Sequence, residues 1–135
     1  MTHPTLVNLT PHPIGLSVDG VVTTIPTSGT VARVSTTPGA QCDTLHGLPV
    51  FLPPTFGPVE GLPEAQEGTV FIVSLLVASA LQAAGAFRTD VVCPGTGPQD
   101  GAVRDEQGRI LAVTRLNRAT QGSLADLLRA DGRRV

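Results

Sequence analysis

Arg104 and Asp105 are the adjacent side chains with the clearest capacity for ligand chemistry in this sequence. A guanidinium stays charged at physiological pH, and its planar fork matches the oxygens of a phosphate group. The carboxylate beside it can accept hydrogen bonds from a ribose hydroxyl or an adenine amino group. Successive residues of a strand point to opposite faces, so these two side chains converge only if the strand ends or bulges there. The alternative is an ordinary pair at the end of a hairpin.

The segments before this pair could supply further ligand contacts. The loop Gly95-Thr96-Gly97 can present backbone N–H groups to an anion, because glycine permits the backbone angles that this requires. Phe71 and Phe87 could offer a stacking surface to a base, although a residue such as Phe71 is more often part of a core. Arg88, with Asp90 nearby, is either a second ligand contact or half of a structural ion pair. Together these residues favour a site for a phosphate-bearing ligand.

The sequence supports catalysis less well. It has no Walker loop, no dinucleotide-binding fingerprint and no serine in a Gly-x-Ser-x-Gly setting. His12 lies between two prolines and could act as a general base, but such a histidine is more often a turn residue. Glu60 and Glu64 could form a metal or acid–base pair, yet in a Pro/Gly-rich segment they are first interpreted as solvated charges. We therefore expect no catalytic residue, no metal site and no cofactor.

Length and composition favour one small domain over 1–135. The chain has 135 residues, of which 41% are hydrophobic and 15% are charged, and its net charge is −2. This balance argues against the binding of long nucleic acids, which depends on clustered cations. Every basic residue is an arginine, so no lysine is available as a Schiff-base amine.

The compartment is predicted from targeting signals and cysteine usage. We recognise no secretion signal, and the longest apolar run, 70–81, is too short to cross a bilayer. These features predict a soluble, intracellular protein. Cys42 and Cys93 are far apart in the sequence and are expected to be buried free thiols. A disulfide between them is the open alternative.

The expected fold class is α+β: an antiparallel meander and a C-terminal hairpin that pack on one apolar central helix, plus a short C-terminal helix. The meander is predicted over 5–34, with a tight turn at Asp19-Gly20. The Pro/Gly-rich segment 36–68 is predicted to be loop and edge strand. The remaining expected elements are a strand at 90–93, a hairpin of 102–105 with 109–116 around a turn at 106–108, and a helix at 123–130.

The central helix is predicted over Leu75–Ala84, directly after a strand that covers 69–74. Ser74 is its expected N-cap, and Gly85 is its expected C-terminal stop. The helix is apolar nearly all round, and such a helix must be buried on several sides. Self-association is one way to cover it in so small a domain, so we expect a homo-oligomer.

Five motifs, in this order, are similar to those of one known family. They are Asn8-Leu9-Thr10-Pro11-His12, Ser28-Gly29-Thr30-Val31-Ala32-Arg33-Val34, Gly61-Leu62-Pro63, Ile72-Val73-Ser74 before the Ala-rich helix, and Val103-Arg104-Asp105-Glu106-Gln107-Gly108-Arg109-Ile110. Over nearly its whole length the chain resembles the first type of Thoeris anti-defence protein, a phage-encoded family. The resemblance implies a non-catalytic sponge that sequesters cyclic ADP-ribose isomers, the signals of bacterial immune enzymes with TIR domains. Some members also bind cyclic oligonucleotides of a second defence system, at separate sites that a hexamer creates.

The resemblance also implies roles for particular residues. Val103, Arg104 and Asp105 would be the ligand-contacting strand, and the helix over Leu75–Ala84 would form a dimer with the pocket near the subunit interface. Phe71, Phe87 and Arg88 are placed near that pocket by neighbourhood alone. The expected ligand-binding residues are therefore Phe71, Phe87, Arg88, Thr96, Gly97, Val103, Arg104 and Asp105.

The expected partners are a small cyclic nucleotide and further copies of the chain, as a homodimer or hexamer. The expected compartment is the cytoplasm of the infected bacterial host, without a membrane or long nucleic acid as partner. Two alternatives stay open. One is a small phosphoesterase or glycohydrolase that acts on a nucleotide-like substrate through His12 and Glu60. The other is a structural or protein-interaction module.

Overall fold

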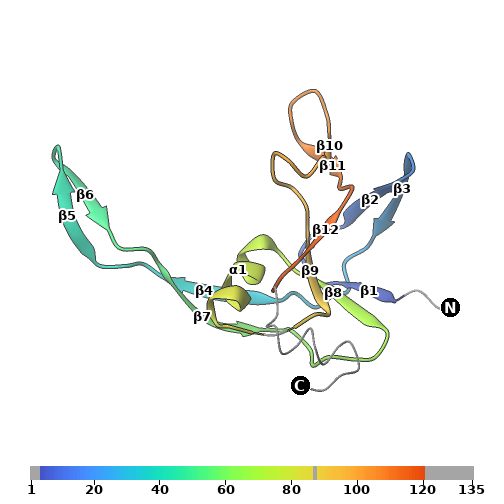
Figure 1. Cartoon of the computed structure of the whole chain (residues 1–135), viewed down its shortest axis with the longest axis horizontal. Coiled ribbons are helices and arrows are strands. Elements are labelled where there is room, and N and C mark those ends of the chain that lie inside the picture. Colours follow the sequence, from blue (N-terminus) through green and yellow to red (C-terminus); the bar gives the residue numbers. More distant parts are fainter. Residues whose placement is uncertain (1–3, 87, 121–135) are drawn as a thin grey trace, which may run out of the picture.

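A four-stranded mixed sheet lies at the centre of the structure, a computed structural model that describes residues 4–86 and 88–120 (Figure 1). Its strand order is β1 (Thr5–Asn8), β8 (Thr69–Ile72), β9 (Val91–Pro94) and β12 (Leu116–Arg118). β1, β8 and β9 run parallel, and β12 runs antiparallel to β9. β-Branched and aromatic residues dominate the inner strands, as expected of strands inside a covered sheet. The carboxyl ends of the parallel strands therefore meet at one edge of the sheet.

Helix α1 (Leu75–Ala83) connects the parallel strands β8 and β9. Ser74 is its N-cap, because the Ser74 Oγ accepts the N–H of Val77 at 3.3 Å. The helix ends before Gly85, whose φ of 70° lies in the left-handed region that glycine favours at this position. The predicted helix is confirmed, and it ends one residue earlier than expected.

The main core lies between the sheet and α1. Successive residues of β8 point to opposite faces, so Phe71 packs in the cluster with α1 and Ile72 packs in a second cluster on the other face. The buried residues of the main cluster are Leu9, Ala32, Phe71, Val73, Val77, Ala78, Leu81, Val91, Cys93 and Ala119. The smaller cluster is built on Ile14, Ile72 and Val113. Both faces of the sheet are thus covered.

The meander predicted over 5–34 is formed only in part. β2 (Ile14–Val18) and β3 (Val21–Ile25) make the expected hairpin. Asp19 and Gly20 both have positive φ, 52° and 80°, as a tight hairpin turn requires. β1 does not join this hairpin, because its backbone groups pair with β8 from a distant part of the chain.

The C-terminal hairpin is present, but its second strand is shorter than the predicted 109–116, because Leu116 belongs to another strand that pairs with β9. The hairpin consists of β10 (Val103–Arg104) and β11 (Ile110–Ala112), which run antiparallel on either side of the expected turn. An isolated parallel bridge between Leu16 and Val113 attaches the end of this hairpin to β2. The class α+β therefore agrees with the structure, whereas the arrangement expected within it does not.

A long two-stranded arm forms over most of 36–68, the segment predicted to be loop and edge strand, so strand takes up more of it than expected. β4 (Arg33–Thr37) pairs with β7 (Thr55–Glu60), and farther out β5 (Gln41–Leu45) pairs with β6 (Leu48–Phe51). Figure 1 shows this ribbon leading away from the rest of the chain. The prolines that argued for a loop are tolerated here, because a two-stranded ribbon has unpaired edges at which a missing N–H breaks no ladder.

The remaining sequence predictions have mixed outcomes. Cys42 and Cys93 are both free, as expected, but only Cys93 is buried, because Cys42 lies on the arm. The helix predicted over 123–130 lies outside the described residues. Within the described ranges, no helix is long and apolar enough to cross a membrane.

Candidate ligand-binding site

A cleft opens where the carboxyl ends of β1, β8 and β9 meet. We call it the strand-end cleft, and its volume is about 320 Å³. Each parallel strand contributes the residues that directly follow it or end it, and this edge is where open α/β sheets usually bind ligands. The lining residues are Thr10, Pro11, His12, Ile14, Ser74, Leu75, Pro94 and Thr96.

A second hollow of about 340 Å³ adjoins the strand-end cleft. The two share His12, Ile14, Pro94 and Thr96, and the second continues along 110–113 of the C-terminal hairpin. Proline, isoleucine, leucine, alanine and valine supply most of its walls. Ligand pockets typically combine apolar walls of this kind with a few polar groups that fix the ligand's orientation.

The buried side chain of Asn8 holds the turn after β1, and this turn forms one wall of the cleft. Asn8 is only 1% exposed, and its Nδ2 donates to the carbonyls of His12 at 2.8 Å and Ile25 at 3.2 Å. Its Oδ1 accepts the backbone N–H of Thr10 at 2.9 Å and the Thr10 hydroxyl at 2.7 Å. Since a buried amide must find partners for all these groups, the turn after β1 is held in one conformation. Sequence reasoning noted this motif only through the family resemblance and gave Asn8 no role.

Arg104 lies at the edge of the cleft. The β10–β11 register shifts between Val103 and Arg104, so the irregularity that the sequence argument required is present. The Arg104 Nη2 donates to the carbonyl of Thr96 at 3.1 Å, and Nη1 donates to the carbonyl of Gly108 at 2.9 Å. Thr96 lines both hollows. The exposed guanidinium is therefore anchored beside the cleft instead of extending freely into solvent.

Unlike Arg104, Asp105 bonds only to groups of its own hairpin turn within the described ranges. Its carboxylate accepts the backbone N–H groups of Gln107 at 2.9 Å and Arg109 at 2.8 Å, and it forms an ion pair with the Arg109 Nε at 2.8 Å. The backbone N–H of Arg109 contributes most to lowering the pKa of Asp105; desolvation opposes it, and the hydrogen bond from the Arg109 guanidinium lowers the pKa further. In the free chain the hairpin turn, not a ligand, uses this carboxylate.

The backbone N–H groups of Gly95 and Gly97 also have partners within the chain. The Gly95 N–H donates to the carbonyl of Arg115 at 3.0 Å, and the Gly97 N–H donates to the Asp100 Oδ2 at 3.0 Å. Asp100 also forms an ion pair with Arg115 at 3.4 Å. The expectation that Gly97 offers its N–H to an external anion is wrong, because an internal carboxylate already takes that place. Thr96 stays in the site through the carbonyl that holds Arg104.

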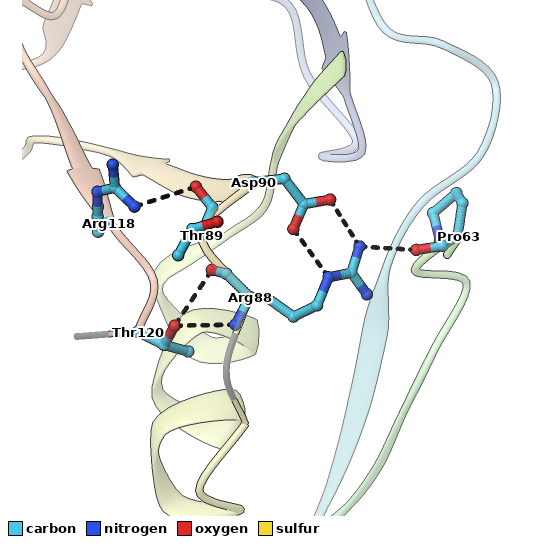
Figure 2. A network of polar contacts seen from close by, with 6 residues as sticks. All are labelled: Pro63, Arg88, Thr89, Asp90, Arg118 and Thr120. Carbon is cyan, nitrogen blue, oxygen red and sulfur yellow. Dashed lines mark hydrogen bonds and ion pairs between the residues drawn. The ribbon is translucent and has the colours of Figure 1, made fainter. Parts of the chain in front are cut away.

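Arg88 belongs to a structural network at the other end of the sheet. Figure 2 shows its guanidinium facing Asp90, with Nε and Nη2 bonded to the carboxylate at 2.8 and 2.9 Å, and Nη2 bonded to the carbonyl of Pro63 at 2.9 Å. The hydrogen bond between the two side chains raises the pKa of Arg88 and lowers the pKa of Asp90. This pair precedes β9, whereas the strand-end cleft follows it. The expected ligand contact by Arg88 is therefore corrected to a structural ion pair.

The other residues singled out from the sequence are dispersed. Phe71 is 2% exposed inside the main core, so it offers no stacking face to a ligand, and Phe87 lies outside the described residues. Val103 is half-exposed beside Arg104. Glu60 lies opposite Arg33 on the arm, away from the cleft. Within the described ranges, no three His, Cys, Asp or Glu side chains are grouped to hold a metal ion.

No protein-family model, curated protein or solved structure matches this chain.

Proposed function

We propose that the protein binds a small, phosphate-bearing cyclic nucleotide in the strand-end cleft and holds it without transforming it. The observation that carries this proposal is the anchoring of the Arg104 guanidinium on the carbonyl of Thr96, a residue that lines the cleft. A phosphate at this edge meets a fixed cation, while the rest of the ligand lies against apolar walls. This combination suits a nucleotide better than a purely apolar molecule.

The guanidinium of Arg104 has further N–H donors that can bind a phosphate. An arginine carries five N–H donors in a fixed fork, and its hydrogen bonds within the described chain go to the carbonyls of Thr96 and Gly108. The remaining N–H groups can bind phosphate oxygens through charge-assisted hydrogen bonds. Because the two carbonyls already fix the fork, little side-chain entropy is lost when the phosphate binds.

The ligand class follows from the resemblance to the first type of Thoeris anti-defence protein. We infer that the ligand is a cyclic ADP-ribose isomer and that its sequestration blocks TIR-based immunity in the cytoplasm of an infected bacterium. Such a molecule combines a pyrophosphate with two riboses and an adenine. It therefore needs a cationic fork for its phosphates and apolar surface for its base. Binding of cyclic oligonucleotides at separate sites is a further expectation from the same resemblance.

Hydrolysis of the nucleotide is the second candidate function, because His12 lines both hollows. An efficient general base is usually oriented by a partner that holds its ring. In the described part of the chain, the hydrogen bonds of His12 are made by its backbone carbonyl. Sequestration requires no nucleophile and no base, so it is the function that the cleft supports better.

Ligand recovery separates the two functions. The protein is incubated with cyclic ADP-ribose and then denatured by heat, and the released nucleotide is identified by mass spectrometry. A sponge returns the cyclic molecule unchanged. A linear product that disappears in the His12→Ala variant would instead establish hydrolysis.

Substitution of Arg104 tests the location of the site. We expect Arg104→Ala to weaken binding about 10- to 150-fold, which corresponds to the loss of a charged hydrogen bond of about 1.5–3 kcal/mol. Arg118→Ala is the matched control, since the Arg118 Nη1 also donates to a backbone carbonyl, that of Thr89 at 3.2 Å, but at the opposite end of the sheet. Calorimetry measures both affinities. Equal affinities for the two variants would rule out the Arg104 site.

A panel of cyclic nucleotides and ADP-ribose isomers tests the ligand class. A ligand that binds the native state raises the melting temperature by an amount that grows with the logarithm of its concentration relative to its Kd. We expect at least one cyclic ADP-ribose isomer to raise it. A protein-interaction module would show no shift with any nucleotide of the panel.

A further inference from the structure

Asp100 ties the loop between β9 and β10 to a distant part of the chain. Its Oδ2 accepts the N–H of Gly97 at 3.0 Å and the Nδ2 of Asn117 at 3.3 Å. Its Oδ1 pairs with the Arg115 Nη1 at 3.4 Å, and its backbone carbonyl accepts the Thr114 hydroxyl at 3.1 Å. The side chain is only 19% exposed, so these contacts are partly shielded from water. We call them the Asp100 lock.

The lock gives a physical reason for the two glycines of the loop. A Cβ on Gly95 would overlap with the Arg115 Cγ, and a Cβ on Gly97 would lie 3.2 Å from the Asp100 Oδ2. Glycine has no Cβ, so the arginine stem and the carboxylate can lie directly against the loop backbone. Both glycines therefore serve the close packing of the chain on itself.

Thr96 lies between these glycines, and its carbonyl holds Arg104. In the described chain the Arg104 guanidinium donates to the carbonyls of Gly108 and Thr96. Gly108 belongs to the turn of the same hairpin, so it moves together with Arg104. The bond to Thr96 is the one that fixes the guanidinium relative to a wall of the strand-end cleft. Whatever holds the loop around Thr96 therefore also sets the position of the fork.

We propose that Asp100 is a positioning residue for the phosphate of the nucleotide, because it keeps the Thr96 carbonyl where it orients the Arg104 fork at the cleft. This inference rests on the proposed function, since it concerns the affinity of the same site. Without the lock, the ligand itself has to order the guanidinium, at a cost in side-chain entropy. A misplacement of about 1 Å in such a group can cost about 100-fold.

The expected loss of affinity has an upper limit. Asp100 acts through Arg104, so its removal cannot cost more than the removal of Arg104, for which we expect about 10- to 150-fold. The Arg104 charge stays in the chain when the lock is removed. We therefore expect Asp100→Ala to weaken the binding of cyclic ADP-ribose about 5- to 30-fold. Asp100→Asn should cost less, because its amide oxygen can still accept the Gly97 N–H.

A double-mutant cycle separates positioning from a general loss of structure. Calorimetry with cyclic ADP-ribose compares Asp100→Ala with the wild type, and then the double variant with Arg104→Ala alone. A residue that acts through Arg104 shows its full loss in the first comparison and almost none in the second. Equal losses in both comparisons would overturn the proposal. So would an Asp100→Ala variant that binds as tightly as the wild type.

Asp90→Ala is the matched control. It removes a carboxylate that is also paired with an arginine and is similarly shielded, with 16% exposure, at the opposite end of the sheet. It should lower the melting temperature and leave the affinity unchanged, and a loss of affinity equal to that of Asp100→Ala would count against positioning. Circular dichroism checks that each variant is folded. The cycle is repeated with Asp100→Asn, which preserves the shape of the side chain.

Side-chain relaxation without nucleotide tests the same contact independently. The ¹⁵N order parameter of the Arg104 Nε reports the fast motion of its guanidinium. We expect it to fall in Asp100→Ala and to keep its wild-type value in Asp90→Ala, where the Arg88 Nε loses order instead. An unchanged order parameter in Asp100→Ala would refute the role of Asp100. A wild type that binds no nucleotide, yet shows these changes in order, would overturn the proposed function and not the positioning of Arg104 by Asp100.

Discussion

Replacing Asn8 with aspartate would remove one half of the network that shapes the strand-end cleft. The two side chains are nearly isosteric, and a carboxylate oxygen can still accept the N–H and hydroxyl of Thr10. The donor half is lost, because the Asn8 Nδ2 reaches the carbonyls of His12 and Ile25. In the variant, an oxygen faces both carbonyls at a position that is 1% exposed, where water has little access.

The size of the effect follows from these two bonds. Each lost hydrogen bond costs about 1 kcal/mol, and a buried carbonyl without a donor costs about 1–3 kcal/mol. We expect Asn8→Asp to lower the free energy of unfolding by about 3–5 kcal/mol at pH 7, which lowers the melting temperature by on the order of 15 °C in a chain of this size. The protonated carboxyl could again donate to a carbonyl, so folding raises the pKa of the new group. The deficit is then complete at neutral pH and shrinks as the carboxyl is protonated, until below about pH 4, where the unfolded state is also protonated, it amounts to about the one hydrogen bond that a single hydroxyl cannot replace.

Scanning calorimetry of the wild type and the variant between pH 7 and pH 4 measures this difference. Comparison at equal pH cancels the titration of the other carboxylates. Thr10→Val is the control, because it removes a hydroxyl and adds no titratable group, so its loss of about 1 kcal/mol should not depend on pH. A melting temperature for Asn8→Asp close to that of the wild type at pH 7, or a deficit that persists unchanged at pH 4, would refute this account of the network.

Two further predictions concern the frame around the site. In Gly15→Ala the new Cβ would lie 2.7 Å from the Leu111 carbonyl oxygen, so β2 and β11 must separate. We expect calorimetry to show a free energy of unfolding lower by about 1–3 kcal/mol, together with weaker nucleotide binding. An unchanged melting temperature would contradict this. Asp90→Asn should lower stability by about 2 kcal/mol at pH 7, because it breaks the charged hydrogen bonds to Arg88. Folding lowers the pKa of Asp90, so its contribution is present above about pH 4 and fades as the pH falls further; melting curves in which the wild type and Asp90→Asn differ equally at pH 3 and pH 7 would exclude this ion pair.

Elements whose signals lie within a few residues could be predicted from the sequence. The start of α1 depends on Ser74, which caps the third residue after it, and its end depends on the left-handed conformation at Gly85. The β2–β3 turn depends on Asp19 and Gly20 alone. Caps and tight turns are local because their hydrogen bonds close within one turn of chain. The helix and the β2–β3 and β10–β11 hairpins were therefore predictable.

Pairing between distant strands was not predictable in the same way. β1 carries the same kind of residues as a meander strand, yet it pairs with β8. The segment that holds Pro49 and Pro58 was predicted to be loop and edge strand, and its pairing into a long two-stranded ribbon was not foreseen. A strand's side chains indicate that it needs a partner, but they do not identify the partner, because many backbone ladders are chemically equivalent.

The sequence by itself determined that arginine forks, a capped apolar helix and glycine turns are present, because each depends on residue type or on immediate neighbours. Only the tertiary structure decided which polar groups are left for a ligand. Arg88 and Arg104 have the same chemistry, but the first finds the carboxylate of Asp90 and the second finds two carbonyls at the edge of a cleft. Whether a charged side chain is already satisfied depends on what the fold brings to it, and those partners come from distant parts of the chain.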